Sequence, residues 1–164
     1  LYKLIVLTML DRVDFPLTNA QISDFILTKE YTNYFTLQQV LSELVETELA
    51  EEHTVRNSTY YQMTEKGKET LNFFGHMVSA AIQEDITKYF KENAITLREE
   101  MSVRADYFEN NQGEYSVRLC VMEKESAVID LTLSVPTENQ ANSLCDNWKK
   151  KNQKIYAYLM QELL

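Results

Sequence analysis

Residues 18–45, TNAQISDFILTKEYTNYFTLQQVLSELV, decide the fold of the first half of the chain. The stretch opens with TNAQ at 18–21, the pattern of a capping box. In such a box the Thr hydroxyl accepts a free backbone N–H, and the Gln side chain reaches back to the Thr N–H. Ile22, Phe25 and Ile26 follow at helical spacing. The stretch therefore predicts a short amphipathic helix directly after this box.

A second helix is predicted behind residues 36–39, TLQQ, which form another capping-box pattern. Its apolar residues recur at i, i+3, i+4, i+7 and i+8 and form one stripe, namely Leu37, Val40, Leu41, Leu44 and Val45. Residues 28–35 form the turn between the two helices. Upstream, residues 2–13 are apolar on much of their circumference, as in a buried central helix. Two capped helices joined by a turn, after a buried helix, are typical of a helix-turn-helix domain.

After Glu48 the apolar period changes from helical to extended. Residues 49–55 and 59–63 flank the polar segment 56–58, which is rich in turn-forming residues, so a β-hairpin is predicted. Thr64 then begins a further helix as its N-cap, and apolar spacing carries that helix to about residue 91. Gly75 is its weakest point, because glycine destabilises helix interiors.

The second half of the chain alternates apolar and polar residues from Thr96 onward. Three alternating segments, 101–107, 115–121 and 127–135, predict an antiparallel meander with one buried face. Pro136 ends the third segment, and residues 137–140, TENQ, cap a long helix whose apolar stripe would cover the sheet. The opposite face carries Arg and Asp side chains that can pair across strands, namely Arg104, Asp106, Arg118 and Asp130.

Composition restricts the function. The 164 residues carry 16 basic and 25 acidic side chains, a formal charge of -9, whereas a protein that only coats nucleic acid should be basic. The two cysteines, Cys120 and Cys145, lie far apart, which favours a reduced cytoplasmic location.

Without an apolar run of 18 residues, no membrane span is expected. Since His53 and His76 have no ligand or catalytic partner at a useful spacing, we expect no enzyme, no metal and no cofactor.

The segment 60–67, YYQMTEKG, followed by Leu71, resembles the Y-x-L-T-x-x-G-x-x-x-L signature that closes the wing of many winged-helix regulators. Tyr61, Thr64, Gly67 and Leu71 match, and Met63 replaces the common Leu. Residues 1–27 and 31–46 resemble an uncharacterised family of Gram-positive anaerobes, usually described as predicted winged-helix transcriptional regulators, with a winged helix of the PadR and MarR type.

The resemblance and the pattern together predict an α+β protein. A winged helix-turn-helix domain is expected at residues 1–75, a connecting helix at 76–93, and a three-stranded antiparallel sheet covered by a long helix at 94–164. The last segment is expected to serve assembly or sensing.

In a winged helix, the third helix enters the major groove of DNA and the hairpin tip reaches phosphate or the minor groove. The predicted contact residues are therefore Lys29, Asn33, Tyr34, Thr36, Gln38, Gln39, Ser42, Arg56, Asn57 and Ser58. Glutamine can pair with adenine, and the start of a helix favours an anion. Two observations leave an ordinary solvated surface open as the alternative. Residues 1–75 hold 6 basic and 11 acidic side chains, and the surrounding aromatic residues, Tyr34 and Phe35 among them, suit core packing better than base stacking.

The resulting hypothesis is a DNA-binding transcriptional regulator. The alternative is a winged helix that docks protein and binds no DNA, which the acidic balance favours. A homodimer is expected because two-fold dimers bind paired half-sites. Two apolar stripes offer contact surfaces, one of Leu71, Phe74, Val78, Ile82 and Ile86 and one of Leu159 and Leu163. In the alternative, both stripes are buried inside one monomer. An effector or a protein partner is a further candidate ligand of the open sheet face.

Overall fold

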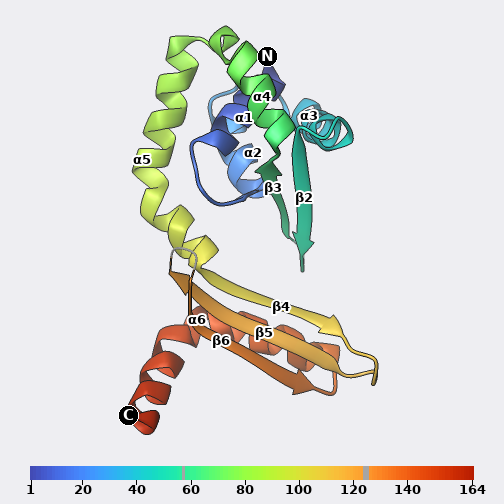
Figure 1. Ribbon diagram of the computed structural model, residues 1–164, viewed down its shortest axis with the longest axis vertical. Helices are drawn as coiled ribbons and strands as arrows, with labels where there is room; N and C mark the ends of the chain where they lie inside the picture. Colours follow the sequence, from blue (N-terminus) through green and yellow to red (C-terminus); the bar gives the residue numbers. More distant parts are fainter. Residues whose placement is uncertain (57, 124–125) are drawn as a thin grey trace. The chain divides into compact units, whose positions relative to one another are not determined.

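The computed structural model describes residues 1–56, 58–123 and 126–164 (Figure 1). Asn57 of the predicted wing tip lies outside these residues. The chain divides into two compact units, Leu1–Ala94 and Ile95–Leu164, each with its own apolar core. The described residues form a mixed α+β structure of six α-helices and two antiparallel three-stranded sheets. Within them, every helix is too short or too polar to cross a membrane.

The first unit combines helices with a small sheet. Its elements are α1 (Tyr2–Asp11), β1 (Leu17–Thr18), α2 (Asn19–Thr28), α3 (Tyr34–Glu46), β2 (Ala50–Val55), β3 (Ser58–Met63), α4 (Glu65–Phe74), the 3₁₀ turn η1 (Gly75–Met77) and the first part of α5 (Ala80–Ser102). The strands lie in the order β1-β3-β2, and both pairs are antiparallel. Leu17 pairs with Tyr61, so the short strand β1 extends the hairpin into a sheet.

The helix α1 is the centre of the first core, as its sequence predicts. Each of its residues from Leu4 to Leu10 is buried, and α1 contacts α3, α4 and β3. The predicted stripe of α3 is also confirmed, since Leu37, Leu41 and Leu44 are buried in the same core. The side of α3 opposite this stripe therefore faces away from the core.

Of the two capping boxes predicted in the first unit, one is confirmed and one is wrong. At α2, Thr18 Oγ1 accepts the Gln21 N–H at 3.0 Å and Gln21 Oε1 accepts the Thr18 N–H at 2.9 Å. At α3, the helix begins earlier than residues 36–39 suggested. Asn33 is its N-cap, and Asn33 Oδ1 accepts the Thr36 N–H at 2.9 Å. Asparagine caps at least as well as threonine, so the earlier start gains extra helical residues with a good cap.

The helix predicted from residue 64 to about 91 is wrong as one element, but it is interrupted at Gly75, its expected weak point. The helix α4 ends at Phe74, η1 follows, and extended backbone at Val78 leads into α5. Because the chain changes direction at this break, Val78 and Ile86 pack in the first core, where both are buried. The apolar stripe from Leu71 to Ile86, predicted as a dimer surface, is thus partly used inside one chain.

The second unit is an antiparallel meander, β4 (Val103–Glu109), β5 (Tyr115–Glu123) and β6 (Ser126–Val135), followed by α6 (Glu138–Leu163). Because α5 continues to Ser102, the first strand begins two residues later than predicted. The predicted capping box at residues 137–140 is confirmed, and α6 lies against one face of all three strands (Figure 1).

The core of the second unit lies between α6 and the face of the sheet that α6 covers. Ala105, Val117 and Leu119 pack with Trp148 and the neighbouring residues of α6. Trp148 Nε1 also donates a hydrogen bond to the Cys120 carbonyl oxygen at 3.2 Å. On the other face, two of the four residues expected to pair across strands form an ion pair, Arg118 and Asp130, 2.7 Å between Nη2 and Oδ2. This bond raises the pKa of Arg118 and lowers that of Asp130.

Candidate nucleic-acid interface

The exposed side of α3 carries two of the predicted contact residues, Gln39 and Ser42. Gln39 Nε2 donates one hydrogen bond to Glu43 Oε1 at 3.2 Å. Glu43 in turn forms an ion pair with Lys3, 2.7 Å between Oε2 and Nζ, and this contact lowers the pKa of Glu43. The carboxylate beside Gln39 is therefore neutralised by α1, which reduces its repulsion of an approaching phosphate.

Gln38 has a different environment from its neighbour. Its amide pairs reciprocally with that of Asn19: Asn19 Nδ2 donates to Gln38 Oε1 at 2.7 Å, and Gln38 Nε2 donates to Asn19 Oδ1 at 3.1 Å. Ser23 also donates to Asn19 Oδ1, at 3.0 Å. These bonds join the start of α2 to α3. Gln38 thus fixes the position of α3, and contact with a base would require breaking both bonds.

The start of α3 presents aromatic rather than polar side chains. Asn33 is occupied as the N-cap, and Thr36 supplies the N–H that it caps. Tyr34 is 51% exposed and Phe35 is 83% exposed. Their rings lie edge to face with centroids 5.9 Å apart. The interpretation of this pair as core packing is wrong, and Phe35 was missed as a surface residue although it lies off the apolar stripe of α3.

Lys29 is held by α5. Its Nζ lies 3.1 Å from Asp85 Oδ1, and the Tyr31 hydroxyl donates to Asp85 Oδ2. The Tyr31 hydrogen bond and the Lys29 contact both lower the pKa of Asp85. Burial and the neighbouring carboxylate raise the pKa of Tyr31 to about 12. Lys29 therefore stabilises the contact between α2 and α5, and phosphate would have to compete with Asp85 for it.

The hairpin is the second part of the predicted interface. Arg56 lies in its turn with a φ of 55°, and the exposed Ser58 pairs with Val55 as β3 begins. Toward the base of β2, Glu51 and Glu52 are both exposed. The tip thus combines an arginine and a hydroxyl, whereas the strand that leads to it is acidic.

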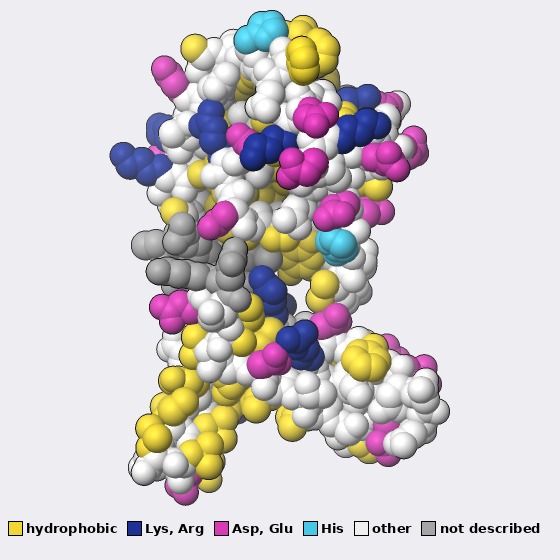
Figure 2. Space-filling model, viewed as in Figure 1, with side chains coloured by type: hydrophobic (Ala, Val, Ile, Leu, Met, Phe, Trp, Pro, Cys, Tyr) yellow, Lys and Arg dark blue, Asp and Glu magenta, His cyan; other side chains and the backbone are white. Residues whose placement is uncertain are grey.

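The charges of this unit are mixed. Lys3, Lys29 and Lys66 each lie within 4.0 Å of a carboxylate, Lys66 being 3.9 Å from Glu48. On the face shown in Figure 2, basic and acidic side chains are interleaved over the upper part of the molecule. A DNA-binding surface here would depend on a few local donors and not on a broad basic field.

The comparisons with known proteins give one match. Residues 2–163 match the family described as a domain of unknown function, DUF4364. No curated protein and no solved structure matches the chain. Because the family match covers nearly every residue, the chain belongs to the DUF4364 family.

Proposed function

We propose that the first unit is a winged helix-turn-helix that binds duplex DNA, and that the protein is a transcriptional regulator. One observation carries the proposal. The element order α1-β1-α2-α3-β2-β3, with the strands arranged β1-β3-β2, has the three helices and the hairpin that a winged helix requires. In that fold α3 is the recognition helix and the β2–β3 hairpin is the wing. The buried stripe of α3 directs Gln39 and Ser42 outward, where such a helix contacts bases.

The proposed contacts differ in kind. Gln39 offers an amide donor and acceptor that match adenine in the major groove, and Ser42 can bond to several bases. Arg56 and Ser58 at the wing would contact phosphate, which positions the protein without selecting sequence. Gln38 and Asn33 act as positioning residues, because their amides hold α3 in place.

The test is selection of binding sites from random duplex DNA by the full chain at low salt. Gln39→Ala should weaken the selected site by about 1–3 kcal/mol, the value of one bidentate base contact. Gln62→Ala, at another exposed glutamine but on β3, is the matched control and should leave affinity unchanged. Arg56→Ala should weaken all sequences equally and reduce the salt slope by about one unit. If the wild-type chain enriches no sequence over the random pool, the proposal is wrong.

A winged helix that docks protein is the second candidate function, and two observations favour it. Tyr34 and Phe35 form an exposed aromatic pair, which is more typical of protein interfaces than of a major-groove surface. Glu51 and Glu52 add negative charge on the adjacent hairpin. If DNA selection fails and Phe35→Ala abolishes the capture of a specific protein partner, this candidate replaces DNA binding.

A further inference from the structure

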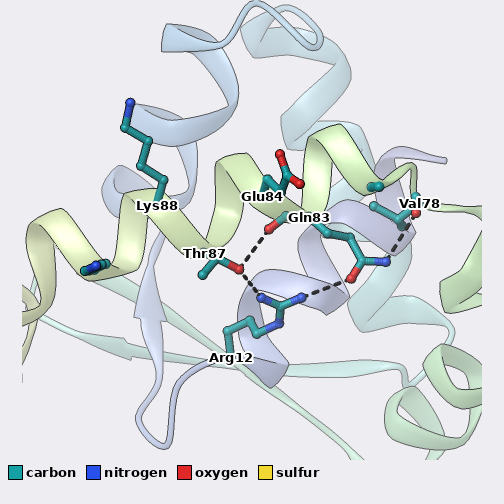
Figure 3. Close-up of a pocket in the computed structure, with 8 residues that line it drawn as sticks. Arg12, Val78, Gln83, Glu84, Thr87 and Lys88 are labelled. Carbon is teal, nitrogen blue, oxygen red and sulfur yellow. Dashed lines mark hydrogen bonds between the residues drawn. The ribbon is translucent and has the colours of Figure 1, made fainter.

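A pocket of about 780 Å³ lies between the end of α1 and the first turns of α5, within the first unit (Figure 3). It is separate from the predicted DNA-contact residues, none of which lines it. The lining residues are Arg12, Val78, Ala80, Gln83, Glu84, Thr87, Lys88 and Lys91.

Arg12 is fixed at the pocket by neutral partners. Its Nη1 donates to Thr87 Oγ1 at 2.5 Å, and its Nη2 donates to Gln83 Oε1 at 3.1 Å (Figure 3). Those partners are held in turn, because Thr87 Oγ1 donates to the Gln83 carbonyl oxygen at 2.9 Å and Gln83 Nε2 donates to the Val78 carbonyl oxygen at 3.2 Å. A guanidinium has five N–H donors. These two bonds orient the group without neutralising its charge.

The pocket is also locally basic. Arg12, Lys88 and Lys91 face one lining carboxylate, Glu84, in a chain whose formal charge is -9. Lys88 lies 3.9 Å from Glu92, in a contact between two exposed side chains. Such exposed pairs contribute little, so Lys88 can exchange this partner for a ligand at low cost.

The two ends of the pocket differ in chemistry. Val78 lies just before α5 and Ala80 begins it, whereas Lys88 and Lys91 lie two to three turns further along the helix. Lys91 lies eleven positions after Ala80 along the helix, a rise of about 16 Å. The first end holds no charged side chain and offers the exposed Ala80 methyl beside the buried Val78, whereas the other end is cationic, with the oriented Arg12 between them at Gln83 and Thr87.

We infer that this pocket binds a small amphipathic organic anion, with a carboxylate or phosphate monoester head at Arg12 and Lys91 and an apolar body toward Val78 and Ala80. Charge-assisted bonds from a planar guanidinium suit both head groups. The inference goes beyond the proposed function and does not depend on it. A binding experiment without DNA tests it separately.

Isothermal titration calorimetry on the full chain provides the test, with octanoate and octyl phosphate as probes of the two head groups. Octanol has the same apolar body without charge, and inorganic phosphate has a head group without the body. We expect saturable one-to-one binding of at least one octyl anion. Octanol and inorganic phosphate should each bind at least about tenfold more weakly, since octanol lacks the charged head group and inorganic phosphate lacks the apolar body.

Variants assign that binding to the pocket. Arg12→Gln and Lys91→Gln should each weaken the octyl anion about tenfold, the usual effect of losing a charge-assisted bond. Lys91 is exposed, so its variant should fold normally even if the loss of Arg12 disturbs α5. Lys68→Gln, at an exposed lysine of α4 outside the pocket, is the matched control. The inference is overturned if neither octyl anion binds, if octanol binds equally well, or if Lys91→Gln and Lys68→Gln behave alike.

Discussion

Asn33, Asn19 and Gln38 use their amide groups to build α3 and to hold it against α2. The Asn33 side-chain oxygen Oδ1 caps the helix, and the two other side-chain amides pair with each other across the α2–α3 contact. Three polar side chains near the predicted contact surface are thus structural. Gln39 and Ser42, two of the predicted contact residues, are exposed on the side of α3 opposite its buried stripe and take no part in these bonds.

The capping role of Asn33 predicts how far substitutions at this residue lower the stability of the protein. Asn33→Ala should lower the free energy of unfolding by about 0.5–2 kcal/mol, because the Thr36 N–H loses its acceptor. Asn33→Ser should retain most of the stability, since serine caps comparably. Urea unfolding followed by far-UV circular dichroism measures the difference.

Thr36→Ala tests whether Asn33 or Thr36 is the N-cap of α3. Its hydroxyl would cap the helix if α3 began at residues 36–39, and the variant would then cost as much as Asn33→Ala. With Asn33 as the cap, Thr36→Ala should change stability much less. Equal losses in the two variants would contradict the assigned start of α3.

At the scale of elements, the signature residues Thr64 and Gly67 join α4 to the base of the hairpin. Thr64 Oγ1 donates to the Glu48 carbonyl oxygen at 2.6 Å and accepts the Gly67 N–H at 3.0 Å. A Cβ at Gly67 would lie 2.0 Å from the Leu49 carbonyl oxygen, which is backbone. The glycine of this motif is therefore required by close packing of helix on hairpin.

Two glycine variants separate packing from helix propensity. Gly67→Ala should destabilise the first unit by about 1–3 kcal/mol or more, because the helix must move away from Leu49. Gly75→Ala should instead stabilise it by up to about 1 kcal/mol, because Gly75 has an ordinary helical φ of -59° and its nearest neighbour for a Cβ is Leu71 Cδ1 at 3.4 Å. Urea titration of the amide NMR signals of residues 1–94 reports on this unit alone. A stabilising Gly67→Ala would refute the packing argument.

At the scale of the whole molecule, α6 is longer than the sheet it covers. Its buried residues end at Asn152, and the helix continues to Leu163. Tyr158 is 61% exposed and Leu163 is 77% exposed. Figure 2 shows hydrophobic side chains gathered where the C-terminal turns of α6 lie in Figure 1. Of the two predicted dimer surfaces, this one stays available for contact with a second copy.

We therefore expect a homodimer that depends on the end of α6. Sedimentation equilibrium at micromolar concentration should give twice the chain mass of 19.2 kDa. Leu159→Glu combined with Leu163→Glu should return the protein to a monomer with an unchanged circular dichroism spectrum, because burying an unpaired carboxylate in an interface is costly. Leu133→Glu, at an exposed leucine of β6, is the control and should remain dimeric. A wild-type mass of 19.2 kDa would exclude the dimer.

The local sequence determined most helices and strands and the alternation of buried and exposed positions. Capping boxes at residues 18–21 and 137–140, the α3 stripe and the alternation in β4 each act over a few residues, so short-range pattern is sufficient to predict them. It also placed Arg118 and Asp130 among four residues able to pair across strands, and the structure joins these two diagonally across β5 and β6.

Tertiary structure alone decided which polar residues remain available for function. Lys29 pairs with Asp85, 56 residues away, and Gln38 pairs with Asn19, 19 residues away. Arg12 contacts Gln83 and Thr87 only because the helical path is interrupted at η1, after which α5 passes the end of α1. Hydrogen bonds and ion pairs act over a few ångströms in space, so partners distant in sequence carry no local pattern. The pocket beside Arg12 therefore becomes visible only after folding.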